Sequence, residues 1–167
     1  ADIKDIVNDI EHFIGNQSID VVIGGPPCQS FSSANQQRMI DDPRNELYKY
    51  FIQAVEKIKP KFVVMENVVG MKKVADQVIE DFHSIQVNVN GSTVSYDVDF
   101  HIFNSEDFSV AQRRQRLFYI AVRDDVANNK QITPQQIIDE IISSCMLNNR
   151  FILSDALQYL RPLEASK

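Results

Sequence analysis

Nine residues near the start of the chain decide its fold class: Asp20-Val21-Val22-Ile23-Gly24-Gly25-Pro26-Pro27-Cys28. The β-branched run at residues 21–23 predicts a buried strand, because branched side chains pack well in a sheet. Two glycines end the run, and the two prolines force the chain out of the sheet, since proline cannot donate to the ladder. The stretch therefore predicts a strand that ends in a rigid turn carrying Cys28.

The segments around this strand alternate between helical and extended patterns. Residues 3–14 and 45–58 place apolar side chains at helical spacing, and Gly15 and Pro60 are typical ends for such helices. Residues 62–65 form a second short apolar run that predicts a strand. Later patterns predict a helix, a hairpin turn, two strands and two helices, at residues 74–85, Asn90-Gly91, 96–104, 117–122, 134–146 and 153–160. This alternation predicts an α/β fold with a mostly parallel sheet, whose ligands bind beyond the carboxyl ends of the strands.

The composition predicts a soluble globular chain. Of its 167 residues, 44% are hydrophobic and 24% are charged. No apolar run approaches the ~18 residues of a membrane span. The net charge of −6 argues against a surface that binds nucleic acid over its whole area, since such surfaces gather Lys and Arg. Two cysteines are too few for a disulfide framework and predict a reducing compartment, either a bacterial cytoplasm or a eukaryotic nucleus.

Cys28 has two interpretations. A lone cysteine in an intracellular chain is most often a small buried hydrophobe. Here it follows a rigid Gly-Gly-Pro-Pro turn at a strand end, which gives a nucleophile both a fixed position and access. The thiolate is the attacking form of such a cysteine. The turn therefore favours a catalytic role.

Glu66 and the basic run at residues 112–116 are the other candidates for chemistry. Glu66 follows the second apolar strand, so a parallel sheet would place it at the same edge as Cys28. It is either a solvated helix cap or a carboxyl group that hydrogen-bonds to, or protonates, a heterocycle held against Cys28. The basic run is either a solvated turn or the start of a strand. In a strand, Arg114 and Arg116 would share one face, where each can contact a carbonyl oxygen, a phosphate or a carboxylate.

Three motifs stand in one order along the chain: Gly25-Pro26-Pro27-Cys28-Gln29-Ser30-Phe31-Ser32, Glu66-Asn67-Val68 and Gln112-Arg113-Arg114-Gln115-Arg116. Together they resemble the motifs of the S-adenosylmethionine-dependent cytosine-5 DNA methyltransferases. The resemblance covers nearly everything from Asp2 to Val122. It implies an α/β chain with a partial Rossmann-like methyltransferase fold, whose mixed sheet lacks its N-terminal strands.

The resemblance also implies roles for individual residues. Cys28 is expected to add to C6 of a cytosine flipped out of double-stranded DNA, so that C5 takes the methyl group, loses its proton and releases the cysteine. Glu66 is expected to contact N3 and the exocyclic amine of the base, and Arg116 its O2, with Arg114 in support. The residues that match the substrate side of the family are Gln29, Ser30, Asn67 and Gln112. Those that match its pocket for the cofactor S-adenosylmethionine are Asp2, Ile3, Pro26 and Leu47.

Departures from the family pattern imply a central fragment. No Phe-x-Gly-x-Gly cofactor loop occurs in the chain, and the acidic residue that binds the ribose is absent. Residues 1–124 are expected to form a partial catalytic core, and residues 125–167 to begin a target-recognition region or linker helices. The strand at residues 21–25 would lack a partner on one side, which predicts self-association through that edge or pairing with missing domains or a complementing subunit.

Three hypotheses for the function stay open. The chain is a DNA methyltransferase core that acts only when completed, or a non-catalytic module that binds a complementing subunit. It is otherwise an RNA-directed member, because the same motifs serve a transfer-RNA branch of the family.

Overall fold

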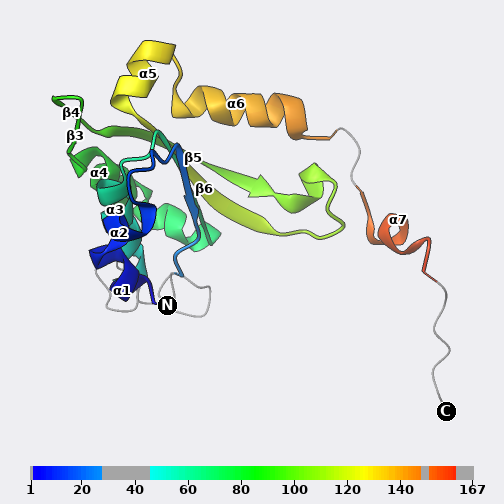
Figure 1. Cartoon of the computed structure of the whole chain (residues 1–167). Helices are drawn as coiled ribbons and strands as arrows, with labels where there is room; N and C mark the ends of the chain where they lie inside the picture. The colour runs from blue at the N-terminus through cyan, green and yellow to red at the C-terminus, as the bar shows by residue number, and fades with distance from the viewer. Residues whose placement is uncertain (1, 28–45, 148–150, 161–167) are drawn as a thin grey trace.

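The chain is built on a four-stranded sheet (Figure 1). Figure 1 shows the computed structural model, which describes residues 2–27, 46–147 and 151–160. The strand order is β1-β2-β6-β5, with bounds Val21–Gly24, Phe62–Asn67, Gln115–Arg123 and Tyr96–Asn104. β1 and β2 are parallel, whereas β2 with β6 and β6 with β5 pair antiparallel.

The mixed sheet confirms the fold class that the resemblance implied, but the prediction of a mostly parallel sheet is wrong. Within the described part of the chain, β1 and β2 form the one parallel pair of this sheet. Residues 105–114 join β5 to β6 and include the short 3-10 helix η4 (Ser105–Phe108). Such a short connection returns the chain antiparallel, since a parallel pair needs a longer crossover.

Two helices cover one face of the sheet, α3 (Glu46–Ile58) and α4 (Ala75–Ser84). Alternation along β2 directs Val63 and Met65 to this face, where both are fully buried. Side chains from both helices and from β5 and β6 complete the core: Tyr48, Val55, Val78, Phe82, Tyr96, Leu117 and Tyr119. This core holds β2 rigidly in the middle of the sheet.

The N-terminal segment forms two short helices, so the prediction of one helix over residues 3–14 is wrong. α1 (Ile3–Asn8) and α2 (Ile10–Ile14) are separated by Asp9, whose φ of −121° and ψ of 23° depart from helical values. Both helices pack against α3, where Val7 and Ile10 are buried. The break at Asp9 lets each helix turn its apolar side chains toward α3.

The expected hairpin is confirmed. β3 (Val87–Val89) and β4 (Ser92–Val94) pair antiparallel across a two-residue turn. Asn90 and Gly91 have φ values of 53° and 84°. Two successive positive φ values are typical of the turn that an Asn-Gly pair favours.

Other element bounds differ modestly from the predictions. The helix expected from residue 74 begins as the 3-10 helix η3 (Val69–Val74) and continues as α4. The strand expected over residues 117–122 is longer, because β6 already pairs with β5 at Gln115 and continues to Arg123.

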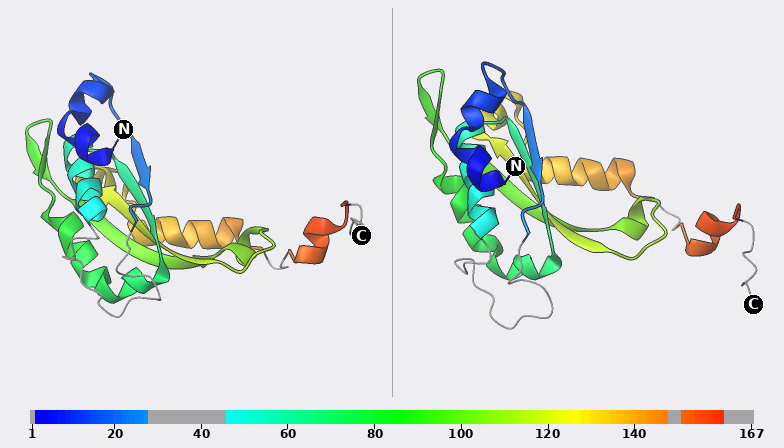
Figure 2. Two further views of the ribbon diagram at one scale, coloured as in Figure 1. Left: turned by 90° about the horizontal axis from the view of Figure 1, so that it is seen from below. Right: turned by 60° about the horizontal axis from the view of Figure 1, so that its bottom comes forward.

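The other face of the sheet is partly covered by α6 (Pro134–Cys145), which runs along β5 and β6 (Figure 2). α5 (Asp124–Lys130) joins β6 to α6, and Thr133 caps α6 by accepting a hydrogen bond from the amide of Gln136 at 3.2 Å. α7 (Leu153–Leu157) has no buried residue. Among the described residues, every helix is too short or too polar to span a bilayer.

Candidate active site at the carboxyl ends of β1 and β2

An ion pair between Glu66 and Arg116 lies where β1 and β2 end. Glu66 Oε1 and Arg116 Nε are 2.8 Å apart, and 38% of the Glu66 side chain and 25% of the Arg116 side chain are exposed. The register explains the contact: Glu66 pairs with Phe118 of β6, and Arg116 lies two residues earlier on the same face. The two groups thus have a defined position and stay accessible to a ligand.

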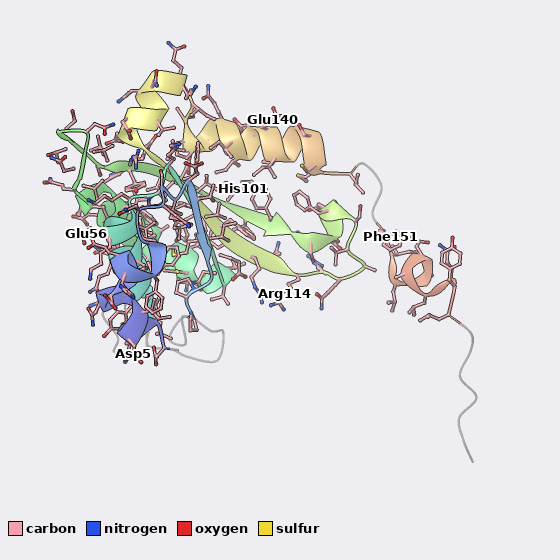
Figure 3. The ribbon with its side chains drawn as sticks, in the orientation of Figure 1. Asp5, Glu56, His101, Arg114, Glu140 and Phe151 are labelled. Carbon is pink, nitrogen blue, oxygen red and sulfur yellow. The ribbon has the colours of Figure 1, made fainter. Side chains whose placement is uncertain are left out.

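Side chains from the end of β5 hold the loop that precedes β6. Asn104 Oδ1 accepts a hydrogen bond from the Arg114 amide at 3.2 Å, and the Ser105 hydroxyl donates to the Gln112 carbonyl oxygen at 2.5 Å. Arg114 precedes β6 rather than lying in it, yet Arg114 and Arg116 line the same cavity, as period two predicts. Figure 3 shows Arg114 near the end of the β5–β6 ribbon. Gln112 is exposed on this loop.

Asn67 follows Glu66 and faces the other side of β2. Only 4% of Asn67 is exposed; its Nδ2 donates to the Pro26 carbonyl oxygen at 3.0 Å, and its Oδ1 accepts from the Val68 amide at 2.8 Å. The turn after β1 also lies close to Glu66, since a Cβ added at Gly25 would be 3.1 Å from Glu66 Oε2. Glu66 and Asn67 therefore both adjoin the turn that leads to Cys28.

Three predicted site residues lie outside the described residues: Cys28, Gln29 and Ser30. Pro27, directly before Cys28, is the last described residue of that segment. The roles expected for the three stay predictions. What the structure brings together is the Gly25–Pro27 turn, Glu66 and Arg116.

A cavity of about 380 Å³ gathers three of the four residues expected to bind a cofactor, namely Ile3, Pro26 and Leu47. Its remaining wall comes mainly from the backbone of the glycines that end β1 and from apolar side chains of α3. Asp2 adjoins Ile3 in the chain, and its Oδ1 caps α1 by accepting from the Lys4 amide at 3.1 Å. The cavity offers apolar walls of the kind that suit a flat ring or an aliphatic chain.

A second cavity, of about 540 Å³, was not predicted from the sequence. It lies between the sheet and α6 and has an apolar lining, to which Arg114 and Arg116 also contribute. The lining residues from the strands, the η4 turn and α6 are Phe62, Val64, Phe103, Phe108, Phe118, Ile120, Ile137 and Ile141. A period-two pattern that runs from Arg114 through Arg116 to Phe118 and Ile120 was the available signal.

The opposite end of β6 carries a structural ion pair. Arg123 is 8% exposed and donates from Nε to Asp125 Oδ1 at 2.7 Å and also to the Lys59 carbonyl oxygen. The hydrogen bonds from Arg123 lower the pKa of Asp125. Burial raises the pKa of Tyr96 above its usual range, and its hydroxyl donates to the Pro60 carbonyl oxygen at 2.7 Å. These groups fasten the loop before β2 to the end of β6, far along the strand from Arg116.

Comparison with known proteins assigns these motifs to a family. The profile of the C-5 cytosine-specific DNA methylases matches residues 1–160. The chain belongs to this family. The three motifs recognised in the sequence lie within the matched residues, and the ion pair at the strand ends joins two of them.

Several bacterial methylases are similar to the chain. It is 37% identical over 160 residues to the type II methyltransferase M.DdeI of Desulfomicrobium norvegicum, a match that covers 92% of the chain and 35% of the relative. It is 43% identical over 109 residues to the type II methyltransferase M.AquIA of Picosynechococcus, covering 63% of the chain and 44% of the relative. A solved DNA modification methyltransferase encoded within an E. coli prophage superposes with a TM-score of 0.68 at 28% identity, over 98% of the chain and 42% of that protein. The chain thus spans less than half the length of these methylases.

Proposed function

We propose that the chain is the central part of the catalytic domain of a type II DNA cytosine-5 methyltransferase. The observation that carries the proposal is the position of the Glu66–Arg116 ion pair, whose carboxylate adjoins the Gly25 backbone, three residues before Cys28. Residues 1–124 form the catalytic core in this proposal, and residues 125–167 begin the target-recognition region or its linker helices. The family match supports the reaction type.

The proposed reaction uses Cys28 as a nucleophile on a cytosine that has left the DNA duplex. The Cys28 thiolate bonds to C6, and the electron pair of the C5–C6 double bond moves to C5. C5 then takes the methyl group, a base removes the C5 proton, the double bond re-forms and the Cys28–C6 bond breaks. In its protonated form Glu66 donates to N3 and accepts from the exocyclic amine, while Arg116 donates to O2, so both residues stabilise the negative charge that develops on the ring. Arg114 and Gln112 support this side of the base.

The cavity lined by Ile3, Pro26 and Leu47 fits the cofactor S-adenosylmethionine, because its apolar walls match the adenine ring and the methionine chain. When bound, this cofactor would supply the electrophilic methyl group that C5 takes, and its sulfonium would leave as a neutral thioether. Asp2 directly precedes the cavity residue Ile3 in the sequence. In this proposal its carboxylate accepts a hydrogen bond from the adenine amine. Gly24 and Gly25 allow close approach because their backbone carries no side chain toward the cavity.

Trapping the covalent adduct tests this function. A DNA duplex containing 5-fluorocytosine would be mixed with labelled S-adenosylmethionine and with the full-length protein that contains this chain. Fluorine at C5 cannot leave as a proton does, so the Cys28–C6 bond persists and the adduct is visible on a denaturing gel. Cys28→Ser is expected to abolish the adduct, whereas Cys145→Ser, which alters the exposed cysteine at the end of α6, is expected to preserve it.

Each alternative hypothesis predicts a different outcome. An adduct with fluorinated transfer RNA but not with DNA would replace DNA by RNA as the substrate. The absence of any adduct in the full-length protein would leave the non-catalytic module as the function. We expect no adduct from the 167-residue chain alone, because the matched region makes up only 35% and 44% of two of its relatives.

In this proposal, the part of the methylase outside these 167 residues packs against the edge strand β1 and the apolar sheet face beside it. β1 is an edge strand, and 46% of Val21 and 75% of Ile23 are exposed. By register, these two side chains share the sheet face that carries Phe62 and Val64 and continues into the 540 Å³ cavity. The edge can extend the sheet, and the apolar face can bury the helices that follow such a strand. In the isolated chain, the same surface favours self-association.

A further inference from the structure

The side-chain amide of Asn67 has a fixed orientation. Its Nδ2 lies 3.0 Å from the Pro26 carbonyl oxygen, which can only accept, and its Oδ1 lies 2.8 Å from the Val68 amide, which can only donate. The two partners therefore define which end of the amide is which. With 4% of the residue exposed, the amide is directed into the protein, away from the accessible side where Glu66 meets Arg116.

The Pro26 carbonyl group lies where the sheet can no longer satisfy it. The pairing of β1 with β2 ends at Gly24 and Met65. Pro26 is buried, and neither Pro26 nor Pro27 has an N–H group that could continue the ladder. The amide of Asn67 takes over as hydrogen-bond donor at the point where the chain leaves the sheet. A buried carbonyl left without a donor is costly, so this contact restricts the turn strongly.

We propose that Asn67 is a positioning residue for the nucleophile, acting through the Pro26 carbonyl group on the backbone that leads to Cys28. Glu66 and Asn67 are neighbours on β2, so one strand end sets both the carboxylate that would face the base and the turn that would carry the thiol. This inference rests on the proposed role of Cys28 as nucleophile. It assigns Asn67 to the geometry of the turn rather than to contact with the substrate.

The reactivity of Cys28 in the 167-residue chain tests the inference without any methyl transfer. Alkylation by iodoacetamide would be followed at both cysteines by mass spectrometry, with exposed Cys145 as the internal reference. Asn67→Ala is expected to change the ratio of the Cys28 to the Cys145 rate by about 10-fold, since small displacements of a reacting group have large effects on rate. Asn88→Ala is the matched control: Asn88 is exposed, and its Oδ1 accepts from the Gly91 amide in the β3–β4 turn.

A second variant separates positioning from loss of folding. Asn67→Asp keeps the acceptor for the Val68 amide but replaces the donor to Pro26 by a carboxylate oxygen. When that carboxyl group is protonated, its O–H can donate to the Pro26 carbonyl oxygen again. The reactivity ratio of this variant should therefore return toward the wild-type value as the pH is lowered, whereas mere destabilisation would worsen in acid. The inference would be overturned if both variants kept the wild-type ratio of the Cys28 to the Cys145 alkylation rate.

In the full-length protein, the two roles of Asn67 predict different kinetics. A positioning residue lowers the rate of adduct formation, by about 10- to 100-fold for a displacement near 1 Å, and leaves the affinity for DNA unchanged. A substrate contact weakens DNA binding instead, and that result would also overturn the inference. If the wild-type protein forms no adduct, the proposed function fails, while the alkylation ratio still reports whether Asn67 sets the turn.

Discussion

Glu66 and Arg116 are both partly exposed, and their strand positions bring them together without a buried environment. An ion pair of this kind contributes little to folding, because water screens it. The same exposure lets a planar base approach both groups at once. At the scale of single residues, the pair is thus better suited to holding a ligand than to stabilising the fold, and Gly25 leaves room beside the Glu66 carboxylate.

Replacing Arg116 by Ala separates these two contributions. The free energy of unfolding, measured in urea, is expected to fall by less than about 1 kcal/mol. Adduct formation by the full-length protein is expected to fall about 100-fold or more, because a donor to the developing charge is lost. Arg113→Ala serves as the control: Arg113 is 79% exposed, and its Nε lies 4.0 Å from Glu106 Oε1. Equal losses of activity in the two variants would contradict a specific role for Arg116.

The adjacent glycines Gly24 and Gly25 are expected to respond differently to an added methyl group. A Cβ at Gly24 would lie 2.5 Å from Phe51 Cε2, so Gly24→Ala should overpack the contact of β1 with α3 and cost about 1–3 kcal/mol. At Gly25 the nearest atom is Glu66 Oε2 at 3.1 Å, the end of a movable side chain. Gly25→Ala should therefore preserve stability better and instead slow adduct formation. Urea unfolding and adduct rates measure both effects, and a Gly25→Ala variant that is less stable than Gly24→Ala would disprove this ranking.

At the scale of elements, the two ends of β6 have different roles. Its first residues carry the arginine of the candidate active site, and its last residue, Arg123, fastens the strand to the start of α5 and to the loop before β2. Both ends depend on the register with β2, which pairs Asn67 with Leu117 and Phe62 with Val122. A shift of one residue would exchange the two faces of β6, turn Arg116 toward the face packed by α3 and α4, and separate it from Glu66.

The Arg123–Asp125 pair predicts an acid-dependent contribution to stability. Hydrogen bonds from Arg123 lower the pKa of Asp125 below the value of about 3.9 expected in the unfolded chain. The pair therefore contributes stability that is complete above the unfolded pKa and is lost as the pH falls through the lower, folded pKa. The difference in urea midpoint between wild type and Asp125→Asn should be constant near neutral pH and shrink below about pH 4. A difference that persists unchanged in strong acid would show that the pairing of the charges does not cause it.

At the scale of the whole molecule, the structure is asymmetric. One face of the sheet is packed by α3 and α4, whereas the face with Ile23, Phe62 and Val64 is only partly covered by α6 (Figure 2). The uncovered part adjoins the edge strand β1. Because the chain matches only 35% and 44% of two of these methylases, we expect their additional polypeptide to occupy this side.

Self-association of the 167-residue chain tests this expectation. Sedimentation velocity at rising concentration should show oligomers, because β1 offers unpaired backbone groups beside an apolar face. Ile23→Lys is expected to shift the distribution toward monomer, since it places a charge on the docking surface. Phe13→Lys is the matched control, because Phe13 is similarly exposed (66%) but lies on α2, away from the sheet face. A wild-type chain that stays monomeric at high concentration would count against docking through β1.

Local patterns were sufficient to predict the strand before the Pro-Pro turn, the second strand from residue 62, the Asn-Gly hairpin and the family itself, since each depends on neighbouring residues or a short motif. The second strand extends two residues beyond its predicted end, to Asn67. The direction of β5 and β6, the contact of Glu66 with Arg116 and the hydrogen bond from Asn67 to Pro26 could not be predicted in this way. Asn67 and Pro26 are 41 positions apart, and only the register of adjacent strands determines that they meet. The cavity beside α6 likewise exists because a helix from beyond β6 packs on one sheet face. Residue types thus determined the chemistry available to this chain, whereas strand pairing determined which groups can act together.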